Sequence, residues 1–505
     1  MKAVSRTSRW ASIVVLVLSV VACGGGGGAG GVGDGSALTM KGIVISPTNS
    51  QLIQGKTLQY SATAVYSDGS GRDISSTVTW LSSDSGIASV NSAGLVSALQ
   101  GGTANIYAQT GGMSAWATMQ VVVPQATETI LHWFDSLPNE DLNPSSLIQG
   151  PDGNLYGQAS STLFKMSLDG TETILHAFSG APSDGSGPGG VLIFASDGNM
   201  YGTTDSGGAY DKGTVFRLTP AGDYSVLYSF GATAADGTAP NSLMQGSDGN
   251  LYGTTWSGGV NTCENVLGAC GTAFKLTLAG VESVIYQFGA SVSDGWRPNG
   301  LVQGPDGNLY GTAPEGGANS NCSCGTVFML TPTGVETTLH SFGSLAVDGF
   351  NPYGPLVLGP DGSFYGTTIH GGSNDANNED HCYVLYSCGT VFKITPAGQE
   401  SVLYAFGSYV DDGNTPGPYL AFGRDGNLYG TTSVGGANGF GTAFRLTPAG
   451  MESVIYSFGA TSTDAITPQG TLIQASDGAF YVLTSAGANG VAVQGLSGSV
   501  VKLQP

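Results

Sequence analysis

The residues best suited to chemistry in this sequence interrupt a regular pattern between residues 256 and 381. They are two tryptophans, an arginine and two ionisable side chains: Trp256, Trp296, Arg297, Glu315 and His370. Asp375, Glu379, Asp380 and His381 extend the group. Aromatic rings beside an arginine and ionisable groups suit a groove that binds a carbohydrate or a peptide. Loop decoration without a function is the alternative interpretation.

Catalysis is a second hypothesis for the same residues, because a polysaccharide lyase or hydrolase could use Glu315, His370 and Arg297. However, the sequence shows no paired-carboxylate spacing, nucleophile elbow or phosphate loop. We therefore expect a non-catalytic binding module for a glycan or a protein, with no enzyme activity and no required cofactor. A structural surface component is a third hypothesis.

The pattern that these residues interrupt is a recurring phrase, clearest as Asp-Gly-Asn-Leu-Tyr-Gly-Thr at Asp306–Thr312. Its copies start at Asp152, Asp197, Asp248, Asp306, Asp361, Asp425 and Asp477. Their spacings, between 45 and 64 residues, indicate a repeat architecture.

Each unit contains four short apolar runs rich in Val, Phe, Tyr and Thr, separated by Gly and Asp, which is typical of strands and turns. No run within the units has a helical period. Seven units of four strands predict an all-β fold, a seven-bladed β-propeller over residues 125–505. The first unit lacks the Gly-Gly loop between Gln158 and Leu163, so we expect a bare hairpin there.

The two ends of the repeat region predict how the ring closes. The run at 128–134 matches the fourth strand of a unit, whereas the chain ends on a run that matches a third strand. We therefore expect the strand at 128–134 to complete the sheet whose other strands lie in 470–503.

Two family resemblances cover most of the chain. The residues Asp248–Thr255, the Gly-Gly pair after them and the run at 389–396 resemble the GloVer repeat, named for Gloeobacter and Verrucomicrobia. That resemblance implies a surface-exposed bacterial repeat protein with no assigned reaction. The runs at 78–84 and 87–96 resemble the bacterial Ig-like domain of group 2, which implies a small β-sandwich at 38–124 that serves as a spacer or adhesive module. Asp68 and Asp73 there could hold a cation, although a solvated hairpin is favoured.

The N-terminus predicts export. Residues 1–22 combine Lys2, Arg6 and Arg9 with an apolar run too short to span a membrane. The run ends in Val-Val-Ala before Cys23, which resembles a bacterial lipobox and implies lipidation of Cys23; an ordinary signal peptide is the alternative. A Gly-rich tether at 23–37 follows. We expect an exported lipoprotein on the outer membrane or cell surface.

Cysteine usage agrees with export. Six cysteines fall in three loops, as Cys263 with Cys270, Cys322 with Cys324 and Cys382 with Cys388. Six thiols in an exported protein predict disulfides. Local pairs are simplest for 263–270 and 382–388, whereas a 322–324 bridge would be strained, so pairing between neighbouring units stays open. A zinc site with His381 is a further alternative.

A second phrase, Asp-Gly-x-x-Pro, begins at Asp184, Asp236, Asp294, Asp348 and Asp412. We expect it on the face that also bears the cysteine loops. The favoured interpretation is that each Asp caps its own turn, and a ring of Ca²⁺ or sugar ligands is the alternative. His132, His176 and His340 replace Tyr at one strand position, which indicates a structural role.

The net charge of −21 argues against nucleic acid and anionic lipid surfaces as partners. We expect a monomer that is held to the membrane by its lipid alone.

Overall fold

The computed structural model describes residues 38–122, 125–134, 144–263, 270–291, 293–319, 322–343, 348–372, 388–408, 411–461, 463–487 and 498–505. Every regular element in these ranges is a β-strand, as expected of an all-β protein. No helix in the described ranges has the length and apolarity to cross a membrane. The predicted signal and tether with Cys23 lie outside the described residues, as do Asp375, Glu379, Asp380, His381 and Cys382.

The N-terminal strands form three sheets around one core. Their bounds are β1 Met40–Ser46, β2 Asn49–Ile53, β3 Thr57–Gln59, β4 Ser61–Tyr66, β5 Gly71–Asp73, β6 Thr79–Ser82, β7 Ala88–Val90, β8 Leu95–Ala98, β9 Gly102–Thr110 and β10 Met113–Val122. The sheet orders are β1-β4-β5, β2-β10-β9-β6 and β3-β8-β7. Tyr60, Trp80, Ile106 and Met119 are buried together between them. Asp68 and Asp73 each accept the backbone N–H two residues on, at 2.9 and 2.8 Å, as turn residues do.

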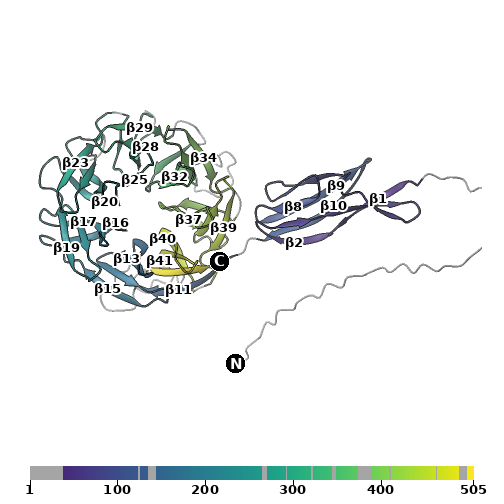
Figure 1. The fold of residues 1–505 in the computed structure, drawn as a ribbon, viewed down its shortest axis with the longest axis horizontal. Coiled ribbons are helices and arrows are strands. Elements are labelled where there is room, and N and C mark those ends of the chain that lie inside the picture. Colours follow the sequence, from purple (N-terminus) through teal and green to yellow (C-terminus); the bar gives the residue numbers. More distant parts are fainter. Residues whose placement is uncertain are drawn as a thin grey trace, which may run out of the picture.

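The repeat region forms successive antiparallel sheets that Figure 1 shows arranged as a ring. The first three sheets consist of β12 Ser146–Gln149, β13 Leu155–Ala159, β14 Thr162–Met166 and β15 Glu172–Ala177; β16 Gly185–Phe194, β17 Met200–Gly207, β18 Thr214–Leu218 and β19 Tyr224–Ser229; and β20 Gly237–Gln245, β21 Leu251–Gly258, β22 Thr272–Leu276 and β23 Glu282–Gln287. In the first of them, Ala159 pairs with Thr162, which confirms the bare hairpin.

The next sheets contain broken first strands. The fourth has β25 Leu301–Gln303, β26 Leu309–Ala313, β28 Thr326–Leu330 and β29 Glu336–Ser341, with the separate pair β24 Gly295–Trp296 and β27 Glu315–Gly316. The fifth has β30 Gly349–Pro352, β31 Val357–Leu358, β32 Phe364–Gly371, β33 Thr390–Ile394 and β34 Glu400–Ala405. The sixth has β35 Gly413–Pro416, β36 Ala421–Phe422, β37 Leu428–Gly435, β38 Thr442–Leu446 and β39 Glu452–Ser457.

The last sheet joins the two ends of the repeat region. It has the order β11-β42-β41-β40, from β11 Thr127–Trp133, β42 Ser499–Gln504, β41 Phe480–Gly487 and β40 Ala465–Gln474. Thr127 pairs with Gln504 and Trp133 with Ser499, so the N-terminal strand supplies the outer edge as predicted (Figure 1).

The recurring Asp-Gly phrase forms the turn between the first and second strands of each sheet. Asp306 accepts hydrogen bonds from the Asn308 N–H at 3.1 Å and the Tyr310 hydroxyl at 2.8 Å. Gly307 takes a positive φ of 82°, which glycine adopts without strain. The phrase is therefore explained by turn geometry.

Neighbouring sheets are joined at a backbone contact that we call the seam. The residue before each Pro of the Asp-Gly-x-x-Pro phrase adopts a positive φ, which is 59° at Arg297, 55° at Asn351 and 56° at Thr415. Its N–H donates to a carbonyl of the preceding sheet, that of Cys270, Cys324 or Cys388 respectively, at 2.8 to 3.0 Å.

The register places the cysteine loops on the expected face. Gly185 pairs with Gly207, and Gly295 pairs with Gly316, so each Asp-Gly lies opposite the Gly-Gly that opens the loop between second and third strands.

Candidate functional site

The end of the second strand of each sheet carries the side chains that differ most between repeats. Trp256 occupies this position in β21, and Asp205 occupies the same position in β17. The next position holds Glu315 in β27 and His370 in β32. Two successive positions of the repeat thus carry diverse side chains at the same end of the sheets.

Three predicted residues form one contact chain. The guanidinium carbon of Arg297 lies 5.2 Å from the centroid of the Trp256 ring. Its Nη1 donates to Glu315 Oε1 at 2.7 Å. Cation–π contacts of this kind contribute about 0.5–1 kcal/mol at exposed sites. Glu315 therefore orients Arg297, and Arg297 in turn supports the indole of Trp256.

Trp256 borders a cavity of about 380 Å³ that we call the channel cavity. It is bounded by residues of five successive sheets, including Asp205, Asn241, Ser242, Trp256, Asn299, Tyr353 and Tyr419. Most of these lie within or beside a first strand, and Figure 1 shows the first strands β16, β20 and β25 nearest the centre of the ring. The cavity combines three aromatic side chains with amide, hydroxyl and carboxyl groups.

The two asparagines of the channel cavity are used to hold neighbouring sheets together. Asn241 Nδ2 donates to the carbonyl of Pro298 at 2.6 Å, and Asn299 Nδ2 donates to that of Pro352 at 2.9 Å. These bonds use the two amide nitrogens and leave the aromatic rings, the Ser242 hydroxyl and the Asp205 carboxyl facing the cavity.

Asp205 and Tyr419 have shifted pKa values. The Asp205 side chain is exposed to the cavity, yet desolvation by the surrounding protein atoms raises the pKa of its carboxyl, and no described residue donates a hydrogen bond to it. Burial raises the pKa of Tyr419 to about 12, with a smaller contribution from the Tyr353 hydroxyl. Tyr419 is therefore a neutral donor and acceptor at neutral pH.

Two of the predicted site residues lie elsewhere. Trp296 pairs with Glu315 in the β24–β27 ladder and lies against Gly316, where an added Cβ would be 2.1 Å from its indole. The ring of His370 lies 5.1 Å from that of Phe350, its partner in the β30–β32 ladder. Burial lowers the pKa of His370.

Sequence reasoning missed Asp205, Tyr353 and Tyr419. The sequence did contain a signal for the two tyrosines. Two or three residues separate the recurring Pro from the Leu of the first strand, and both their number and their types differ between units. Tyr353 and Tyr419 lie among these residues and line the channel cavity, whereas Asp205 lies in the second strand β17.

The cysteines pair locally. Cys263 is bonded to Cys270 and Cys322 to Cys324, with Cα–Cα distances of 5.6 and 5.2 Å. The open alternative of pairing between units is therefore wrong for these four. Cys388 is also disulfide-bonded, and its predicted partner Cys382 lies outside the described residues.

The aspartates of the Asp-Gly-x-x-Pro phrase are buried and cap their own turns. Their exposed fractions are 6% for Asp184, 5% for Asp236, 3% for Asp294, 5% for Asp348 and 4% for Asp412. Asp236 accepts the N–H groups of Gly231 and Ala232 at 2.8 and 3.1 Å, and Asp412 accepts that of Ser408 at 2.8 Å. The capping interpretation is thus supported by the contacts.

Each of these aspartates also meets the fourth strands of two sheets, at a place we call the acid junction. The Tyr228 hydroxyl donates to Asp236 at 3.0 Å and lies 3.5 Å from Glu282 of the next sheet. At equivalent places, His176 Nε2 lies 3.0 Å from Asp184 and His340 Nε2 lies 3.3 Å from Asp348. His132 lies 3.6 Å from Glu172. The three histidines therefore take the structural place of tyrosine, as predicted.

Comparison with protein families identifies the chain. The model of the Gloeobacter/Verrucomicrobia repeat matches residues 91–261, 158–378, 236–416 and 380–505. Residues 39–119 match the bacterial Ig-like domain of group 2. The chain belongs to the family of Gloeobacter/Verrucomicrobia repeat proteins.

Individual relatives are more distant. Ice-binding protein 1 of Shewanella frigidimarina is 39% identical over 106 residues, which is 21% of this chain and 11% of that protein. The chain thus matches only about a ninth of that relative's length.

Among solved structures, the extracellular domain of a protein described as a hybrid two component system (BT3049) of B. thetaiotaomicron gives a TM-score of 0.48 at 12% identity, over 79% of this chain and 44% of that one. A gluconolactonase of Xanthomonas campestris gives 0.36 at 14% identity, over 62% and 87%. PorZ, a surface component of the type-IX secretion system of Porphyromonas gingivalis, gives 0.38 at 13%, over 84% and 52%.

Proposed function

We propose that this chain is an exported, lipid-anchored and non-catalytic module that binds a glycan in the channel cavity. Its repeat region is a seven-bladed β-propeller at 125–505, and residues 38–124 are an Ig-like β-sandwich that spaces it from the tether. Among the described residues, seven successive sheets of four or five strands and the pairing of β11 with β42 support the propeller.

The observation that carries the function is the convergence of Trp256, Tyr353 and Tyr419 on one cavity beside the carboxyl of Asp205. Aromatic faces stack on the apolar faces of sugar rings, while hydroxyl and carboxyl groups accept their hydrogen bonds. Tyr353 is 50% exposed, so its ring is available without rearrangement. A cavity of about 380 Å³ lies at the small end of ligand sites. This size favours one or two sugar units over a protein surface.

The contacts of the remaining polar residues favour binding over catalysis. Glu315 is held by Arg297 at 2.7 Å, and His370 packs against Phe350. Arg297 also supports Trp256. Glu315 and Arg297 therefore position Trp256 in this proposal, whereas His370 does not line the cavity.

A glycan array with purified protein tests the proposal. We expect at least one array member to bind, with a loss of about tenfold or more in Trp256→Ala and Tyr353→Ala, since stacked aromatic rings dominate such sites. Trp296→Ala is the matched control, because that indole packs on Gly316 outside the cavity. Binding that is lost equally in the control, or that persists in both cavity variants, would contradict the proposal.

The anchor has its own test. Cys23 is the proposed lipidation site, so radiolabelled fatty acid should enter the full chain and fail to enter Cys23→Ser. Release of the unlabelled variant into the soluble fraction would accompany the loss. Equal labelling of both chains would exclude Cys23 as the anchor.

A further inference from the structure

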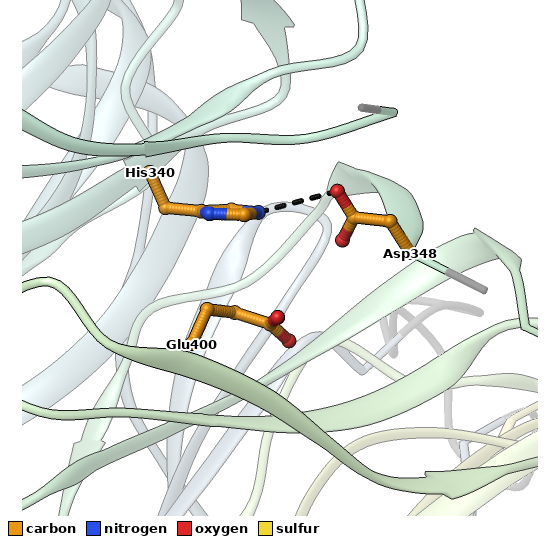
Figure 2. Close-up of side chains that lie close together, drawn as sticks. All are labelled: His340, Asp348 and Glu400. Carbon is orange, nitrogen blue, oxygen red and sulfur yellow. Dashed lines mark hydrogen bonds and ion pairs between the residues drawn. The ribbon is translucent and has the colours of Figure 1, made fainter. Parts of the chain in front are cut away.

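One acid junction differs from the others in its chemistry. His340 at the end of β29, Asp348 before β30 and Glu400 at the start of β34 converge from two adjacent sheets, as Figure 2 shows. His340 Nε2 lies 3.3 Å from Asp348 Oδ2. One ligand atom from each of the three residues lies within 4.8 Å of the other two.

The repeats provide an internal comparison. At the junctions of Asp236, Asp294 and Asp412 the residue in the place of His340 is a tyrosine, namely Tyr228, Tyr286 and Tyr404. The junction of Asp184 also has an imidazole, that of His176. However, the next sheet contributes Tyr224 there in place of the glutamate found at the other junctions, and the centroids of the His176 and Tyr224 rings lie 3.6 Å apart. Among the described residues, only the junction of Asp348 unites an imidazole with two carboxylates.

Two carboxylates meet one imidazole at this junction, an arrangement that favours a positive charge between them. Two carboxylates that share a buried site cannot both ionise without a compensating charge. Glu400 Oε1 is buried and makes no hydrogen bond. The equivalent Asp236 Oδ1 and Glu282 Oε1 have none either, and Asp236 is only 5% exposed. The tyrosine junctions lack the imidazole nitrogen that ions of the Zn²⁺ class prefer, so they are less suited to bind such an ion.

We propose that His340, Asp348 and Glu400 bind a divalent transition metal ion of the Zn²⁺ class. One imidazole nitrogen and two carboxylate oxygens form a donor set that suits this class, whereas Ca²⁺ prefers oxygen ligands alone. Since His340 and Glu400 come from neighbouring sheets, the bound ion links the fourth sheet to the fifth beside the β30 connection.

Titration of the full chain, stripped of metal with a chelator, tests the site. Isothermal calorimetry with Zn²⁺ should give one strong site in the wild type. The affinity should fall at least tenfold in His340→Tyr, which installs the residue found at sister junctions, and in Glu400→Gln. His176→Tyr is the matched control and should bind as the wild type does. Bound Co²⁺ should show visible absorption that is lost in the same two variants.

The thermal unfolding temperature of the metal-free variants shows that they are folded, and addition of Zn²⁺ should raise it in the wild type and the control only. Several results would overturn the proposal: no binding of Zn²⁺ by the wild type at millimolar concentration, binding that both variants retain, or a preference for Ca²⁺ over Zn²⁺.

Discussion

The backbone N–H of Arg297 donates a hydrogen bond of 2.8 Å to the carbonyl oxygen of Cys270, which lies in the preceding sheet. Arg297 adopts a φ of 59° to make this bond, although side chains other than glycine are strained there. The same arrangement recurs at Asn351 and Thr415. The seam therefore fixes Arg297 where its guanidinium reaches Trp256, which couples the packing of two sheets to the channel cavity.

Crowding at the seam predicts that Gly271→Ala is strongly destabilising. Gly271 has a φ of 91°, and an added Cβ would lie 2.3 Å from the Thr255 carbonyl oxygen and 2.9 Å from Pro298 Cδ. We expect the free energy of unfolding to fall by about 2 kcal/mol or more. Gly249→Ala is the control, because its φ is 81° but nothing lies within 4 Å of the added Cβ. That change should cost about 1 kcal/mol, measured by urea denaturation. If both variants lost the same free energy of unfolding, backbone strain alone would account for the effect, and crowding at the seam would contribute nothing.

The disulfide beside this seam should stabilise the site as well as the fold. The sulfurs of Cys263 and Cys270 would lie 3.2 and 2.3 Å from a Cβ added at Gly289, so the bridge packs on the connection that leads to Arg297. Replacing both cysteines with serine should cost about 2 kcal/mol, because the bridge closes a short loop. Calorimetry of the variant measures this loss, and glycan affinity should weaken with it. An unchanged glycan affinity in a destabilised variant would show that the disulfide stabilises the fold without affecting the binding site.

Much of the fold follows from the sequence because turns are local. The Asp306 phrase contains its own hydrogen-bond acceptor and its own glycine, so each copy specifies a turn without help from distant residues. The pairing of β11 with β42 was also predictable, since an unmatched fourth strand and an unmatched third strand occur at opposite ends of the repeats. The local pairing of Cys322 with Cys324 was not, because it depends on how tightly the loop turns.

The candidate site was only partly predictable, because a cavity at the centre of a ring collects one residue from each of several distant units. Trp256 was found as a rare residue type that breaks the repeat. Tyr353 and Tyr419 were missed because tyrosine is common in the repeats, and only the distance from the preceding proline marks these two. Trp296 broke the repeat equally, but its place in the β24–β27 ladder turns it onto Gly316.

The closing strand predicts an unusual sensitivity to truncation. Glu128 of β11 accepts the Tyr456 hydroxyl at 2.8 Å and the Ala465 N–H at 3.2 Å, so the strand contacts the sixth sheet as well as its own. A chain that starts at residue 125 should unfold in one cooperative transition. Removal of ten more residues, up to 134, should expose the edge of β42 and abolish that cooperativity. Scanning calorimetry compares the two chains, and identical transitions would show that closure adds nothing.

The acid junctions predict that stability falls as the pH rises from about 4.5 to about 7. Burial raises the pKa of Glu282 to about 7, with a contribution from the charge of Asp236, and the pKa of Glu336 to about 7 in the same way beside Asp294. These values exceed the ordinary value of 4.5, so the folded state holds protons that the unfolded chain releases. The resulting stability is complete below pH of about 4.5 and is lost as the pH rises through about 7.

Glu282→Gln tests this dependence, because the amide keeps the shape of the protonated carboxyl and cannot ionise. The wild type should lose about 1–2 kcal/mol for each such carboxyl between pH 5 and pH 8, less than the full pKa shift implies, because both carboxyls are partly exposed and solvent screens them. The variant should lose less over the same interval, and Glu282→Gln with Glu336→Gln should flatten the profile further because the two residues lie at separate junctions. Thermal melts across this pH range, in the presence of a chelator, measure the slope. A wild-type melting temperature that rises between pH 5 and pH 8, or a double variant with the wild-type slope, would show that these carboxyls are not protonated in the folded protein.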